Sequence, residues 1–421
     1  MRAGLGAQAR VWHGGNMLRI HHDLNDTPDE STPDTRGPSK QYADACWQAD
    51  PRLSPDWWHE GLGRTFGKLA LDWRANLHQQ DYLDGGCNMV LVSPRTWAQA
   101  QVVIGQSPHA GACIPLLVTS QVTPLPTHLP PFVVWQPGSS TTFAQRRHAL
   151  HTLETLVYQR KIEGYGLLLD TTDPHPLHTW LEEAGLVATT VWERRKRPAL
   201  QIIMVEQDLL DLSLFTTKTT RHRDEPVSPL ELAARLNLTT ILLPSALPNA
   251  STLPQEALAA LTLAAEEENT LNRFLGGWPQ IGGQPLFSLL AHVSRGRAPW
   301  PTPAIWRNWR IHVWPQLQST WQHLLSPANR PHIQRYLQHL EALERYGEAL
   351  SSHAAQPLLE DGLNYMLPRM PEAWRHENNL TRALGVLSSL PGVGAVAVSV
   401  PFLLQPLRHL PNLPDVGRLL T

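Results

Sequence analysis

The sequence predicts an α/β or α+β front half with a short mixed sheet, followed by a mainly helical back half. Between residues 57 and 215, short apolar runs alternate with amphipathic segments, which is typical of strands layered with helices. Beyond residue 230, apolar residues recur at helical spacing over several long segments. A chain of 421 residues is long enough for more than one domain, each with its own core.

The front half contains the strand signals. Short apolar runs predict buried strands at residues 88–93, 113–119, 132–135 and 165–169. A strand pair is predicted at residues 187–192 and 199–205. Helices are predicted at residues 62–77, 146–161 and 176–184, and residues 97–104 fit either a strand or a helix.

The back half contains mostly helix signals. Helices are predicted at residues 253–271, 306–325, 333–350 and 371–390. Pro315 predicts a break or kink in the second of these. The apolar run at 393–404 is too short to span a membrane and predicts a buried helix or strand.

Composition shifts along the chain predict the domain boundaries. Residues 1–56 form a predicted flexible segment, because much of it is rich in Asp, Pro, Ser and Thr. Residues 206–230 are charged and rich in Pro and Thr, which is typical of a linker. We therefore expect an α/β domain at 57–215 and a helical domain at 230–421.

Charge and cysteine content exclude several classes of protein. Charged residues make up only 17% of the chain, so part of its surface is expected to be neutral or covered by a partner. The net charge of −2 provides no overall field that would attract nucleic acid. Three widely spaced cysteines fit neither a disulfide framework nor a zinc site. A cytoplasmic protein without membrane contact is expected.

No catalytic motif stands out. The chain contains neither a P-loop nor a dinucleotide-binding fingerprint, so the sequence predicts no cofactor. Asp170 and Asp173 follow a predicted strand, and ligands of α/β folds bind at such strand ends. Together with His175 and His178, Asp173 could ligate a metal. A polar loop in which Asp173 caps the next helix explains the pattern better, and we predict no metal.

Two basic runs are candidate phosphate-binding sites. The first comprises Arg194, Arg195, Lys196 and Arg197, and the second comprises Lys218, Arg221 and Arg223. A hairpin tip with solvated charges is the alternative explanation for them.

Tryptophan is unusually frequent, with sixteen residues in the chain. Trp300, Trp306 and Trp309 lie in one Trp-rich stretch, and clusters of this kind occur at protein interfaces. They also occur in cores. The sequence therefore makes these three residues candidates for binding a partner, with core packing as the alternative.

One region resembles the large subunit of type I-F CRISPR surveillance complexes. That family has a Gly-Gly-x-x-Pro-Gln-type signature, then a Ser-Leu stretch, a glycine and a segment rich in Pro and Trp. The corresponding residues here are Gly276, Gly277, Pro279, Gln280, Ser288, Leu289, Gly296, Arg297, Pro299, Pro301, Pro303 and Trp306, preceded by Leu242, Leu243, Pro244 and Ser245. The lysine and asparagine of the family signature are missing, and Trp278 and Ile281 stand nearby. The resemblance covers about 65 residues around Gly276–Trp306 and implies a non-catalytic subunit that contacts RNA or DNA.

A second resemblance lies in the front half. The order of predicted elements over residues 112–205 is similar to that of an acyl-CoA-type N-acyltransferase module, although the loop that binds the acyl donor is not visible.

These observations predict a non-catalytic subunit of an intracellular bacterial complex. Its partners would be other protein subunits, with RNA or DNA as a further candidate ligand. The alternative is an α/β transferase with a site near Asp170 and Asp173.

Overall fold

The protein is described from a computed structural model. The structure describes residues 37–413 and residue 416, except residues 51, 75–86, 139–140, 170–176, 193–196, 208, 211–216, 219, 223–224, 245, 249–252, 282–283, 296–297 and 399–406.

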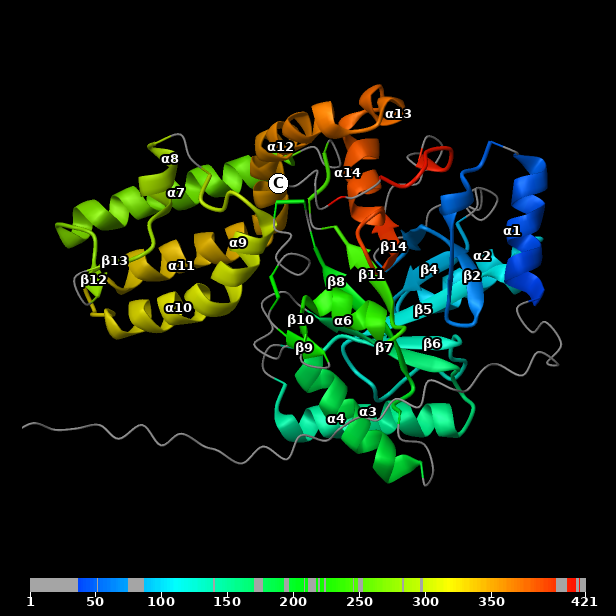
Figure 1. Cartoon of the computed structure of the whole chain (residues 1–421). Helices are drawn as coiled ribbons and strands as arrows, with labels where there is room; N and C mark the ends of the chain where they lie inside the picture. The colour runs from blue at the N-terminus through cyan, green and yellow to red at the C-terminus, as the bar shows by residue number, and fades with distance from the viewer. Residues whose placement is uncertain are drawn as a thin grey trace, which may run out of the picture.

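Eight parallel strands form a closed barrel (Figure 1). Seven strands follow one another in chain order around the barrel, and the eighth pairs with the first and the seventh. The strands are β3 (Leu69–Asp72), β4 (Met89–Val92), β5 (Ile114–Thr119), β6 (Phe132–Trp135), β7 (Gly164–Leu169), β8 (Leu200–Glu206), β11 (Thr239–Leu243) and β14 (Val393–Val398).

The predicted fold class is therefore wrong. The sheet is neither short nor mixed, and its last two strands, β11 and β14, come from the half that was expected to be helical. Both are short and fully buried. The strands of such a sheet are covered on both faces and lose the alternation of polar and apolar residues that identifies a half-exposed strand. Residues 215–230, where a domain boundary was expected, lie in the chain between β8 and β11, which are neighbouring strands of the barrel.

Two shorter predictions of secondary structure are also wrong. Residues 62–77 contain strand β3 and part of a hairpin rather than one helix, and residues 187–191 end helix α4 (Leu177–Val191) rather than forming a strand. Helix α1 (Gly37–Ala49) lies within the segment predicted to be flexible. The ambiguous stretch at 97–104 is helix α2 (Trp97–Gln106).

Side chains alternate between the inside and the outside of the barrel. One cluster fills the interior with mostly branched or large residues, among them Leu91, Leu116, Phe132, Met204 and Ile241. The alternate residues on the same strands join a second cluster that packs against the surrounding helices. Phe66 is fully buried in the interior cluster, and it belongs to the hairpin of β1 (Trp58–Gly61) and β2 (Arg64–Gly67).

The outer helices have well-formed N-terminal ends. In α3 (Phe143–Tyr158), Thr142 and Gln145 form a capping box, and in α6 (Pro229–Arg235), Ser228 and Glu231 do the same. Helices α3 and α4 are joined by a buried bidentate ion pair between Arg146 and Glu183. Helix α14 (Asn379–Ser388) packs on β14, and β9 (Thr220–His222) pairs with β10 (Glu225–Val227) ahead of α6.

A large helical insertion separates the seventh barrel strand from the eighth, and Figure 1 shows most of it beside the barrel. Its own core includes Trp300, Trp306, Trp309, Trp314 and Trp321 and shares no residue with the barrel clusters. Its helices are α7 (Gln255–Leu275), α8 (Leu289–Val293), α9 (Pro303–Asn308), α10 (Trp314–His323), α11 (Arg330–Glu344) and α12 (Gly347–Met366), with a π-helical turn at Trp309–Val313, followed by α13 (Glu372–Arg375). Within the described residues, no helix is long and apolar enough to cross a membrane.

Glu268 joins three helices of the insertion. Its buried carboxylate, on α7, accepts hydrogen bonds from the Ser288 hydroxyl, the Leu289 backbone amide at 2.8 Å and the Tyr336 hydroxyl at 3.1 Å. Burial raises the pKa of Glu268, although these hydrogen bonds act to lower it. Tyr336 is fully buried beside it, and burial also raises the pKa of Tyr336. The carboxylate thus anchors the start of α8 to α7 and α11.

The raised pKa of Glu268 predicts a pH-dependent contribution to stability. A carboxyl whose pKa is higher in the folded state stabilises the fold at low pH, and that contribution is lost as pH rises through the folded-state pKa. We expect the free energy of unfolding of the wild type, relative to Glu268→Gln, to increase as pH falls from 7 towards 4.5. Urea unfolding of both proteins across this range measures it, and a relative decrease would contradict the prediction.

The Trp306 ring leaves no room for a side chain at Gly347. A Cβ at Gly347 would lie 2.3 Å from atoms of that ring, whereas a Cβ at Gly362, on the same helix, would have no neighbour within 4 Å. We expect Gly347→Ala to lower the free energy of unfolding by about 1–3 kcal/mol through overpacking. Gly362→Ala should raise it by up to about 1 kcal/mol, because Ala favours helix. Equal effects of the two variants in urea unfolding would refute the steric argument.

Candidate active site at the barrel mouth

Polar residues form one inward-facing layer at the C-terminal ends of the barrel strands. In β3, Ala70 belongs to the interior cluster and Leu71 to the outer cluster, so Asp72 faces inward. In β8, Met204 is interior and Val205 is outer, which turns Glu206 inward by the same alternation. The alternation also places Ser93, Ser120 and Gln136 in this layer, one step beyond β4, β5 and β6. We call this end of the barrel the mouth.

Asp72 and Arg74 form a bidentate ion pair at the mouth. The Nε of Arg74 donates to one carboxylate oxygen of Asp72 at 2.8 Å, and its Nη2 donates to the other at 2.7 Å. The Ser93 hydroxyl donates to the backbone oxygen of Arg74 at 2.9 Å. Burial acts to lower the pKa of Arg74, but the Asp72 carboxylate and the charge of Glu206 outweigh it and raise the pKa. Arg74 therefore stays charged between two carboxylates.

Glu206 extends this charge network to the helical insertion. Arg307 of α9 lies 2.5 Å from the Glu206 carboxylate and 3.8 Å from that of Glu348 on α12. The Arg307 side chain is 14% exposed, and its Nε has no hydrogen-bond partner within the described residues. The insertion thus provides charged side chains that lie beside the barrel strands.

The insertion also contacts the mouth through apolar groups. Ala246, which follows β11, packs in a small cluster with Ala355 and Leu359 of α12 and with Leu209, which follows β8. The side-chain amide of Gln356 donates to the backbone oxygen of Leu247 at 3.0 Å. Helix α12 is therefore fixed against the segments that follow β8 and β11.

The arrangement can hold a polar ligand and move protons. Asp72, Glu206 and Glu348 are matched by Arg74 and Arg307, which leaves one net negative charge on this set. Carboxylates at partly buried positions are common general acids and bases. No group of three or more His, Cys, Asp or Glu side chains suited to a metal ion occurs among the residues that the structure describes.

The residues that follow the strand predicted at 165–169 are only partly described. Asp170, Asp173 and His175 lie outside the described residues. His178 is exposed on helix α4.

The basic residues are only partly described. Arg194, Arg195, Lys196 and Arg223 lie outside the described residues. Arg197 and Lys218 are exposed, and Arg221 belongs to strand β9. Their role in binding phosphate groups stays a prediction.

The tryptophans proposed to bind a partner are core residues of the insertion. Trp300, Trp306 and Trp309 are 2%, 2% and 6% exposed. Their rings contact one another, with centroids 4.6 to 5.4 Å apart. The structure thus favours the packing alternative and leaves these rings little surface for a partner.

Sequence reasoning missed the residues that form the charged layer. Asp72 and Glu206 each end a buried apolar strand, and this signal was available in the sequence. Arg74 follows Asp72 at a spacing of two, but residues 62–77 were read as one helix. Arg307 could not be found from sequence, because only the folded insertion brings it to Glu206.

Comparisons with known proteins give distant structural matches only. No protein-family model matches the chain, and no curated protein matches it. A glycerol dehydrogenase from Gluconobacter oxydans is similar with a TM-score of 0.38 and 11% identity, over 84% of this chain and 90% of that one. A thermostable aldo-keto reductase solved with the inhibitor epalrestat is similar with a TM-score of 0.29 and 11% identity, over 50% and 80%. Likenesses this distant support no inference about activity.

The resemblance to the CRISPR-complex subunit is wrong. Gly276 ends helix α7 in the left-handed conformation (φ 69°), and Gln280 begins a hairpin of β12 (Gln280–Ile281) and β13 (Gln284–Pro285). These residues therefore perform local folding roles inside an insertion of a closed eight-stranded barrel. Residues 112–205 provide four neighbouring strands of the closed barrel, which overturns the acyltransferase resemblance. The predicted complex subunit and the alternative transferase are both wrong, because the chain forms a closed barrel of eight parallel strands in place of the short mixed sheet and separate helical domain to which they were assigned.

Removing Arg307 should weaken the attachment of the insertion to the barrel. Arg307→Met keeps the apolar part of the side chain but leaves Glu206 without its closest cation. We expect a loss of about 1–2 kcal/mol in the free energy of unfolding, below that of a fully buried pair because both groups are partly exposed. The matched control is Arg310→Met, because Arg310 pairs with Glu344 on the surface at 2.8 Å.

The control should lose less than about 0.5 kcal/mol. Urea unfolding measures both effects, and hydrogen exchange at the end of β8 locates the change. Equal losses in the two variants would contradict a special role of Arg307.

Proposed function

We propose that the chain is an enzyme whose active site is the charged layer at the barrel mouth. In this proposal Asp72 and Glu206 provide acid–base catalysis on a small neutral or cationic substrate that carries several hydroxyl or amine groups.

The main support for the proposal is that the charged layer lies at the C-terminal ends of the barrel strands. Enzymes built on closed barrels of eight parallel strands have their active sites at the C-terminal ends of the strands, because the loops that vary between them lie there. Asp72 and Glu206 lie at these ends, whereas the interior layers below them are apolar.

The fixed positions of the two carboxylates support a catalytic role. Each belongs to a barrel strand, and rigid elements hold reacting groups more accurately than loops do. Arg74 hydrogen-bonds both oxygens of Asp72, and Arg307 lies next to Glu206. A carboxylate held in this way can accept a proton from a substrate.

The charge balance of the mouth supports the substrate class. Among the described residues, both guanidinium groups are already paired with carboxylates. An anionic substrate would have to displace Glu206 or Asp72 from an arginine. A substrate with hydroxyl or amine donors binds without that cost, because carboxylate oxygens accept its hydrogen bonds.

The test is a panel of polyols, sugars and amino alcohols, examined with the full chain for binding by thermal shift and for chemical change by mass spectrometry. Asp72→Asn and Glu206→Gln should each lower kcat for a converted compound by about 10²–10⁴-fold, because each removes a group able to take a proton. Glu225→Gln is the matched control, since Glu225 forms a surface ion pair with Arg235 at 2.7 Å.

The control variant should retain full activity. The proposal is overturned if no compound of the panel binds or is converted. It is equally overturned if both Asp72→Asn and Glu206→Gln retain the activity of the control.

A further inference from the structure

The helical insertion contains a pocket of about 450 Å³. Its walls are formed by α8, by α12 and by residues between α8 and α9. Binding sites for small molecules typically have volumes of about 300–1,000 Å³, so the pocket is large enough for a small ligand. None of the residues of the charged layer at the barrel mouth lines it.

Most of the pocket wall is apolar and accessible from solvent. Helix α12 contributes Ala354, Pro357 and Leu358, which share one face of the helix because they are three and four positions apart. Leu358 is 45% exposed, and Pro357 is exposed as well. Ala298 and Pro301 add exposed apolar surface from the chain between α8 and α9. A ligand with an apolar part can therefore contact these side chains directly.

The polar side chains of the pocket are both basic. Among the described residues they are Arg295, which is exposed, and His292, which is half-buried beside the ring of Phe287. The Arg295 guanidinium forms no hydrogen bond or ion pair with another described residue. No acidic residue is present in the described lining of the pocket. Because a guanidinium donates two parallel hydrogen bonds to a carboxylate, the pocket suits a ligand with one carboxylate group.

The walls of the pocket are fixed by packing on other parts of the fold. Leu289, in α8, and Trp300 belong to the buried tryptophan cluster of the insertion. On α12, Ala355 and Leu359 pack with Ala246, which follows β11. A ligand therefore meets walls that are already in place, which reduces the entropic cost of binding.

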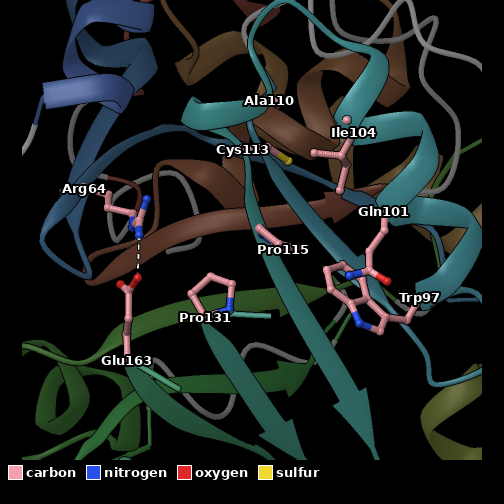
Figure 2. A pocket seen from close by; sticks show the side chains of 10 residues that line it. Arg64, Trp97, Gln101, Ile104, Ala110, Cys113, Pro115, Pro131 and Glu163 are labelled. Atoms are coloured by element: carbon pink, nitrogen blue, oxygen red, sulfur yellow. Dashed lines mark hydrogen bonds and ion pairs between the residues drawn. The ribbon is translucent and has the colours of Figure 1, made fainter. Parts of the chain in front are cut away.

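Another pocket, beside α2, is less suited to a ligand (Figure 2). Its charged side chains, Arg64 and Glu163, form an ion pair with each other at 2.7 Å. Trp97 is only 6% exposed and Pro115 is buried, so they offer little surface for contact. An unpaired charge beside accessible apolar surface is thus a property of the pocket on the insertion.

We propose that the pocket on the insertion binds a small organic monoanion, namely a carboxylate attached to a short apolar chain. The carboxylate pairs with Arg295 and accepts a hydrogen bond from His292, and the apolar chain lies along the exposed face of α12. This is a second site, and it does not depend on catalysis at the mouth.

The experiment is isothermal titration calorimetry of the full chain with octanoate. Octanamide is one comparison ligand, because it has the same chain without the charge, and acetate is the other, because it has the charge without the chain. We expect octanoate to bind about tenfold more tightly than octanamide, since hydrogen bonds between charged groups are stronger than those of a neutral amide. Acetate should bind more weakly than octanamide, because it buries almost no apolar surface.

Two variants with matched controls locate the site. Arg295→Met should weaken octanoate binding by about tenfold, whereas Arg310→Met, which removes the same charge from an arginine paired with Glu344, should leave it unchanged. Leu358→Gln should weaken binding severalfold. Its control is Leu263→Gln, because Leu263 is 49% exposed on α7 and does not line the pocket.

Four outcomes overturn the proposal. They are no binding of octanoate, equal binding of octanamide, equal effects of Arg295→Met and Arg310→Met, and equal effects of Leu358→Gln and Leu263→Gln. Asp72→Asn should leave octanoate binding unchanged, which separates a failure of this site from a failure of the proposed active site.

Discussion

The pairing of β14 with both β3 and β11 is the constraint on which the structure depends. Val396 lies beside Leu69 on one side and Leu242 on the other, so residues far apart in the sequence form neighbouring strands. Without β14, both β3 and β11 would present an unpaired edge, and the apolar interior would be open along one side. The barrel closes only when β14 is in place between β3 and β11. In the chain, β14 comes after the whole insertion. The closure also determines the geometry of the mouth. Strand β3, which holds Asp72, pairs directly with β14, and strand β8, which holds Glu206, is joined to β14 through β11.

The sequence predicted four strands of the front half, missed β3 and took the end of α4 for a strand. The runs at 88–93, 113–119, 132–135 and 165–169 coincide with β4, β5, β6 and β7 to within one or two residues, because each is short, apolar and bounded by turn residues. Strand β11 has the same character, but no strand was predicted there, because it lies in the half of the chain that was expected to be helical. Gly394 weakens the strand pattern of β14, and its run remained ambiguous between helix and strand. What the sequence lacked was the register between distant strands, which decides between an open sheet and a closed barrel.

The candidate site was less predictable than the fold, for a physical reason. A layer of inward-facing polar residues is recognisable only after the inside of each strand is known. Ala70 and Leu71 are both buried, so burial alone does not separate the interior from the outer cluster. The ion pair of Arg307 with Glu206 joins residues about a hundred positions apart, on elements that were assigned to different domains. The sequence patterns that suggested sites, namely the basic runs and the tryptophan cluster, lie in other parts of the chain. The three tryptophans are buried in the core of the insertion.

The separate core of the insertion has a consequence for the evolution of the chain. Its tryptophan cluster shares no member with the clusters that pack the barrel. The part of the insertion that packs around the tryptophans could therefore change with little effect on the barrel, whereas the end of α12 and α13 could not, because Leu363, Met366 and Trp374 pack in the outer barrel cluster. The residues that would have to change together are those through which the insertion contacts the barrel. These are Arg307 and Glu348, and the small apolar contact of Ala355 and Leu359 with Ala246. Differences between related chains should then concentrate where the insertion contacts the barrel, while Asp72 and Glu206 stay on the barrel strands.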